Sequence, residues 1–143
     1  MQLMIQMKRK LSSTDIEDRI RRRLARRYST PLEKGKLKIK GVLAEFDFVS
    51  HKQIIGQIKS SAPRRREKLK GKMMKQTQFG DFSRDCLLLA AKKAKIRLFV
   101  LTNGIAFREF CRSPQGKAAE LLGIRILLER PNRAQKSSTI YPD

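Results

Sequence analysis

The sequence predicts a mixed α/β fold in one domain, with a central mixed sheet and flanking helices. Three observations predict it: an amphipathic helix comes first, three strand-like segments follow, and a second helix then leads into an almost wholly apolar strand. A helix that joins two strands of one sheet returns the chain to that sheet. Since 143 residues suffice for one hydrophobic core, we expect a single domain over 1–130 and a disordered tail over 131–143.

The first helix is predicted to begin at Thr14. Thr14 and Glu17 have the spacing of a capping box, and apolar residues that include Ile20 and Leu24 recur every four positions. The other faces of this helix carry many arginines. Pro31 ends it, because the residue before a proline is pushed out of helical geometry.

Strands are predicted over 36–42, 43–49 and 54–60, since apolar and polar residues alternate there with a period of two. Gly41 marks a bend or a bulge. The second strand is expected to separate its residues onto two faces, with Ala44, Phe46 and Phe48 on one and Glu45, Asp47 and Val49 on the other.

The second half of the chain predicts a helix over 81–95, with Leu87 among its buried positions, and a strand over 96–102 that is covered on both faces. Short helices over 106–111 and 115–122 precede a last apolar segment over 124–128.

The charge is the most informative bulk property. The chain has 34 Lys and Arg against 13 Asp and Glu, a formal net charge of +21. A domain this positive repels itself unless a polyanion is nearby, so nucleic acid is the expected partner. The sequence has no long apolar segment of the kind that would indicate a membrane partner.

The sequence favours an intracellular, cytoplasmic protein. The apolar N-terminal stretch precedes its basic residues, which is the reverse of the order in a signal peptide. Cys86 and Cys111 lie in predicted helices and are expected to be free thiols. With His51 as its single histidine, the chain is poorly suited to histidine-based catalysis or zinc sites.

Polar residues occupy core-like positions on two neighbouring strands. Asp47 lies between two phenylalanines, and Gln57 and Lys59 flank Ile58 on a strand that a hairpin would place beside it. Burying a carboxylate, an amide and an ammonium group together is costly unless they satisfy one another or a metal ion. Such clusters are more common at functional sites than elsewhere.

These segments, 45–50 and 54–61, resemble the core of the PD-(D/E)XK, or restriction-endonuclease-like, nucleases. That family has an αβββαβ core with an Asp on one strand and an acidic-X-Lys motif on the next, so the likeness covers about residues 14 to 102. The resemblance implies a metal-dependent nuclease domain. Asp47 would be the shared metal ligand, Gln57 would occupy the acidic position, Lys59 would be the catalytic lysine and Glu17 a fourth member. Gln57 departs from the usual acid but is similar to the Gln-X-Lys of the Mrr-like branch.

The resemblance implies a Mg²⁺- or Mn²⁺-dependent endonuclease that hydrolyses DNA phosphodiester bonds, with a homodimer expected if it cuts duplexes. An amide oxygen can ligate Mg²⁺ but adds no charge, so Gln57→Glu should keep or raise activity. Basic residues are expected to hold the phosphates without reading sequence. They are Arg22, Arg23 and Arg26 on the first helix and Arg64, Arg65, Arg66, Lys68, Lys70 and Lys72 in the connection after the third strand.

Plainer interpretations stay open. Glu17 is more simply half of a capping box, and Glu45 could replace Asp47 as the ligand, although a surface position suits it better. The chain could also be a catalytically inactive nucleic-acid-binding protein on the same fold, or a basic RNA- or ribosome-associated protein in which the Asp47 and Lys59 pattern is a coincidence.

Overall fold

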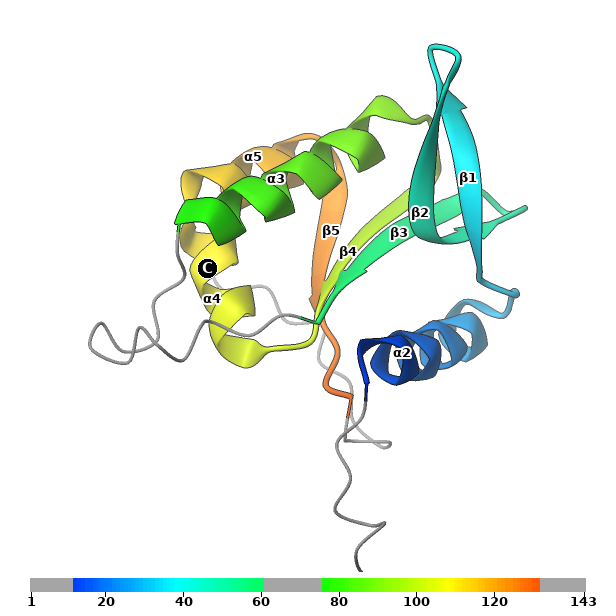
Figure 1. Cartoon of the computed structure of the whole chain (residues 1–143), viewed down its shortest axis with the longest axis horizontal. Helices are drawn as coiled ribbons and strands as arrows, with labels where there is room; N and C mark the ends of the chain where they lie inside the picture. The colour runs from blue at the N-terminus through cyan, green and yellow to red at the C-terminus, as the bar shows by residue number, and fades with distance from the viewer. Residues whose placement is uncertain (1–11, 61–75, 132–143) are drawn as a thin grey trace, which may run out of the picture.

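The chain forms a five-stranded mixed sheet with helices on both faces, as the computed structural model shows for residues 12–60 and 76–131 (Figure 1). The elements in chain order are α2 (Ser13–Tyr28), β1 (Glu33–Ile39), β2 (Val42–Ser50), β3 (Ile54–Lys59), α3 (Gln76–Ala91), β4 (Ile96–Leu101), α4 (Gly104–Arg112), α5 (Pro114–Leu121) and β5 (Ile124–Leu128). The predicted mixed α/β class, with a central mixed sheet and flanking helices, and the predicted order of elements are confirmed.

The strands lie in the sheet in sequence order, β1-β2-β3-β4-β5. The two pairs from β1 to β3 are antiparallel, and the two pairs from β3 to β5 are parallel. Each parallel pair is joined by a helical crossover, through α3 for the first and through α4 and α5 for the second. The carboxyl ends of β3, β4 and β5 therefore meet at one edge of the sheet.

Two hydrophobic clusters cover the two faces. The larger one packs the sheet against α3, α4 and α5, and its centre is a trio of rings, Phe82, Phe99 and Phe110, at edge-to-face angles with centroids 5.4 Å apart. The smaller cluster lies under α2, where Ile20 and Leu24 are fully buried. Figure 1 shows α2 on one side of the sheet and the other three helices on the opposite side.

The predicted capping box of α2 is wrong by two residues. Ser12 is the N-cap, its hydroxyl accepts from Asp15 N, and the Asp15 carboxylate accepts from Ser12 N. Ser12 and Asp15 have the same spacing and the same hydrogen-bonding ability as the predicted pair. Glu17 is thus one turn inside the helix and has no capping role.

β1 begins and ends three residues before its predicted range. Lys40 and Gly41 have φ of 52° and 85° and form the two-residue turn that closes the hairpin between Ile39 and Val42. The predicted bend at Gly41 is this turn.

The predicted faces of β2 are wrong at Phe48 and Val49, because Val49 packs with Phe46 and Phe48 does not. Gly35 pairs with Phe46 and Glu33 with Val49, so two steps along β1 span three steps along β2. One extra residue in β2 is a β-bulge, which reverses the alternation of side chains. Phe46 therefore packs on the α3 side and Phe48 on the α2 side.

Gly56 explains how Phe48 fits on its face. It lies directly across from Phe48, and a Cβ at this position would lie 2.0 Å from Phe48 Cζ. Only glycine leaves room for the ring.

α3 begins five residues before its predicted start and ends at Ala91. Its buried positions include Phe82, Cys86 and Leu89, whereas Leu87 is exposed and not buried as predicted. The strand predictions near the C-terminus hold: β4 is covered on both faces, and β5 has the predicted bounds.

Cys86 and Cys111 are free and buried, as predicted, and burial raises the pKa of each thiol to about 12. Within the two described ranges, no helix is both long and apolar enough to cross a membrane. The predicted tail lies outside the described residues except for Pro131.

Candidate active site

β2 and β3 separate at the bulge, and side chains replace the backbone ladder there. The last pair before the separation is Phe48 with Gly56. The Gln57 amide then spans the gap, because its Oε1 accepts from Asp47 N at 3.3 Å and its Nε2 donates to Glu45 O at 3.2 Å. A carboxylate could not donate to Glu45 O, which gives a physical reason for glutamine at this buried position.

The Asp47 carboxylate completes the same junction. Its Oδ2 accepts a hydrogen bond from Ile58 N at 2.7 Å. Burial raises the pKa of the Asp47 carboxyl above its ordinary value, and the Asp85 carboxylate raises it further. The hydrogen bond from Ile58 and the charges of Lys59 and Arg21 lower this pKa but do not outweigh burial.

Lys59 lies beyond Gln57 on the same face of β3. Its Nζ lies 3.0 Å from Asp85 Oδ2 on α3, and both side chains are partly exposed. Asp85 is therefore a site residue that the sequence did not predict. The sequence held only a weak indication of this role. Asp85 is a carboxylate next to the buried Cys86, at the edge of the buried face of α3.

α2 brings two more groups to the bulge. Glu17 is partly buried, and its pKa is raised first by burial and then by the Asp47 carboxylate. Arg21 Nη1 donates to Asp47 O at 2.7 Å, and the same guanidinium group pairs with Asp18. Arg21 thus links α2 to the backbone of the bulge. Its guanidinium group forms no direct ion pair with the Asp47 carboxylate.

The structure brings together the four residues predicted as catalytic, Asp47, Gln57, Lys59 and Glu17, at the bulge. The predicted phosphate contacts separate into three groups. Arg22 and Arg26 are exposed on α2, whereas Arg23 Nη1 lies 3.0 Å from the buried Glu129. The other predicted contacts, Arg64, Arg65, Arg66, Lys68, Lys70 and Lys72, lie outside the described residues.

Glu129 is a second buried carboxylate that the sequence did not predict. It is fully buried just after β5, where Arg27 Nη1 lies 2.8 Å from its Oε2 and Arg23 approaches its Oε1. Its backbone N–H donates to Leu101 O at 2.9 Å. The group joins the end of β5 to the C-terminal half of α2 and has the surroundings of a structural ion pair.

The donors around Asp47 suit a divalent cation that keeps much of its water. Over 12–60 and 76–131, no three Asp, Glu, His or Cys side chains are grouped so that they could hold a metal ion. Mg²⁺ commonly needs only one or two protein carboxylates together with water and substrate phosphate. Asp47 and Asp85 are the carboxylates that would fill this role, and no described residue donates a hydrogen bond to Asp47 Oδ1.

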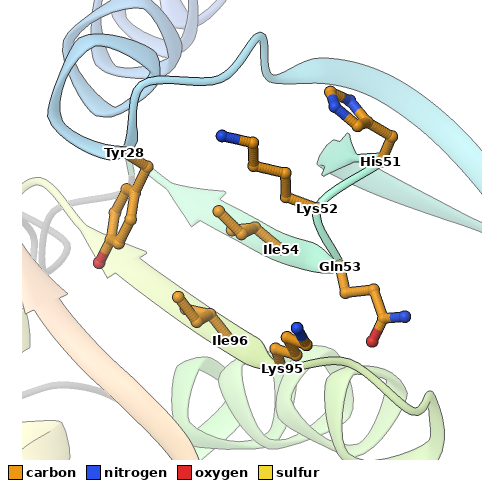
Figure 2. Close-up of a pocket in the computed structure, with 7 residues that line it drawn as sticks. All are labelled: Tyr28, His51, Lys52, Gln53, Ile54, Lys95 and Ile96. Carbon is orange, nitrogen blue, oxygen red and sulfur yellow. The ribbon is translucent and has the colours of Figure 1, made fainter.

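A cavity of about 390 Å³ lies at the amino ends of β3 and β4, at the other end of the sheet from Lys59 (Figure 2). Ile54 and Ile96 line its floor, and Tyr28, Lys52 and Lys95 surround it. No carboxylate lines it, so it lacks the donors that a magnesium site requires.

No family of known sequences, no curated protein and no solved structure matches this chain.

Proposed function

We propose that the chain binds nucleic acid and that the Asp47 cluster is a metal-dependent nuclease site of the restriction-endonuclease-like type, which acts on DNA phosphodiester bonds. One observation carries the proposal: Asp47 is a shielded carboxylate with a raised pKa, beside a second carboxylate and a lysine, in a chain of net charge +21. A carboxylate whose charged form is disfavoured by burial is stabilised by a bound cation. A protein with a large positive charge attracts a polyanionic substrate.

The order of elements supports the same proposal. A helix, three antiparallel strands, a crossover helix and a parallel strand correspond to the αβββαβ core of that family. Asp47 lies on the second of these strands and Lys59 on the third, where the family has its aspartate and its lysine.

The roles follow from the contacts. Mg²⁺ or Mn²⁺ would be held by Asp47 and Asp85, and when bound it supplies a water of lowered pKa and stabilises charge on the phosphate. Lys59 is placed to offset developing charge on the phosphate oxygens. Gln57 holds the two strands at the distance that this arrangement needs, with its carbonyl oxygen as a neutral third donor.

A second candidate function is a catalytically inactive nucleic-acid-binding protein on the same fold. It is favoured by the Lys59–Asp85 ion pair, which occupies both charges, and by the engagement of the Gln57 amide with the backbone. In that case the cluster would serve only to hold α3 and β2 against β3. The third interpretation, an RNA-associated basic protein, predicts binding to RNA in preference to DNA.

The decisive experiment incubates the protein with supercoiled, linear and branched DNA in Mg²⁺, Mn²⁺ or chelator. We expect cleavage with either metal, none in chelator, and none from Asp47→Asn, while Glu45→Gln cleaves like the wild type. Glu45 is the matched control, since it is an exposed carboxylate two residues away on the same strand. Cleavage by Asp47→Asn at the wild-type rate would contradict the site. DNA binding without cleavage under any metal would support the inactive alternative.

A further inference from the structure

A polar cavity opens at the carboxyl edge of the three parallel strands. It has a volume of about 560 Å³ and is lined by Ser60 after β3, Thr102 and Gly104 after β4, and Arg130 after β5. In sheets with parallel strands, ligands commonly bind outside the carboxyl ends of the strands. Ser60 directly follows Lys59, so the cavity adjoins the candidate active site along the chain.

Two guanidinium groups converge above Gly104. A Cβ on Gly104 would lie 3.4 Å from Arg130 Nη2 and 3.6 Å from Arg108 Nη1, although the two arginines come from different elements. Both side chains are exposed, and neither forms an ion pair or a hydrogen bond with another described residue. Two like charges this close repel each other, so an anion between them would lower the energy of the arrangement.

The surroundings select among anions. Guanidinium groups bind phosphate oxygens through paired hydrogen bonds, and the Ser60 hydroxyl adds a donor at the wall of the cavity, whereas the Thr102 hydroxyl already donates to Lys59 O. The Ile105 and Ala106 amides at the start of α4 are not free to bind an anion, because both already donate to Asn103 Oδ1 at 3.0 Å. The groups suited to bind a phosphate here are therefore the guanidinium groups of Arg108 and Arg130.

We propose that Arg108 and Arg130 form a phosphate-binding site that holds one backbone phosphate of a nucleic acid beside the Asp47 cluster. The choice of a nucleic-acid phosphate rests on the proposed function, whereas the existence of the site rests on the two arginines and the cavity. A phosphate held there would place the strand across the carboxyl ends of β3 and β4, next to Lys59.

The test compares two double variants in chelator, with a short labelled DNA duplex at several salt concentrations. One is Arg108→Gln with Arg130→Gln. The control is Arg112→Gln with Arg125→Gln, which removes the same charge from exposed positions on α4 and β5. We expect the first variant to lose about tenfold more affinity than the control and to flatten the salt dependence by about one unit, the contribution of one phosphate. Equal losses in both variants would overturn the site.

A second measurement needs neither DNA nor catalysis. Titration of the ¹⁵N-labelled protein with inorganic phosphate should shift the Gly104 amide resonance in a saturable way in the wild type and the control, but not in Arg108→Gln with Arg130→Gln. No shift in the wild type would also overturn the site. Both experiments are independent of metal and of cleavage, so a protein that never cuts DNA can pass them, and a proven nuclease can fail them.

Discussion

Asp47 and Glu129 are both carboxylates shielded from solvent beside the sheet, and their surroundings differ sharply. Glu129 is fully buried, yet two guanidinium groups from α2 lie within 3.0 Å of its oxygens. Asp47 is only half-buried, but one backbone N–H is its single direct donor among the described residues, and burial raises its pKa. The more deeply buried charge is the better compensated one.

The difference indicates two uses of a buried charge. A carboxylate held by two arginines from another element contributes to the assembly of the fold, since its removal takes a buried counter-charge away from both cations. A carboxylate with a raised pKa, next to a second carboxylate, retains an unmet demand for positive charge. The nearby cation, Lys59, forms its ion pair with Asp85 and not with Asp47.

The largest expected effect is on the Glu129 side of this comparison. Glu129→Ala should lower the free energy of unfolding by about 3–5 kcal/mol, because Arg23 and Arg27 each lose an ion pair with a fully buried carboxylate. Urea denaturation measures this, with the exposed Glu33→Ala as control. A loss below about 1 kcal/mol would place Glu129 among surface ion pairs and remove the contrast with Asp47.

Gln57→Glu should give an intermediate effect. In chelator we expect a loss of about 1–3 kcal/mol, because the new carboxylate cannot donate to Glu45 O and lies beside Asp47. Mn²⁺ should restore more stability to this variant than to the wild type, since the added charge strengthens cation binding.

Gln57→Leu is the control for that experiment, because it loses both hydrogen bonds without gaining charge. Thermal unfolding with and without Mn²⁺ checks the prediction. Equal responses of Gln57→Glu and Gln57→Leu to Mn²⁺ would mean that no cation binds near position 57.

A smaller effect should appear in the pH dependence of stability. Because the folded pKa of Asp47 is raised, its protonated form stabilises the fold below the unfolded value of 3.8, and this contribution is lost as the pH rises through the folded pKa. Asp47→Asn should therefore gain stability relative to the wild type over that window. Urea titrations from pH 3 to pH 7 measure the difference. A difference that moves in the opposite direction would show that the fold stabilises the charged form of Asp47.

The sequence was sufficient to predict the elements with strong periodicity. The α2 face with Ile20 and Leu24 and the strand at Ile124–Leu128 needed only local patterns, because their burial follows the spacing of apolar residues. The capping box was displaced since Ser12 and Asp15 offer the same chemistry as Thr14 and Glu17.

The site was predicted only in part. Asp47, Gln57 and Lys59 stood out because polar residues interrupt apolar strands. The bulge that orients them depends on the register with β1, which alternation cannot show when both faces of a strand carry phenylalanines. Asp85 and Glu129 depend on contacts between elements that are distant in sequence, and each resembles a surface residue in its own segment.

Paramagnetic broadening by Mn²⁺ tests the central claim most directly, because it reports the position of the ion without requiring cleavage. In the ¹⁵N-labelled wild type, sub-stoichiometric Mn²⁺ should first broaden the amide resonances of Asp47 and Ile58, which the carboxylate of Asp47 adjoins. Asp47→Asn should abolish this local broadening, and Glu45→Gln should retain it. Broadening that persists unchanged in Asp47→Asn, or that spares both amides in the wild type, would contradict a metal site at Asp47.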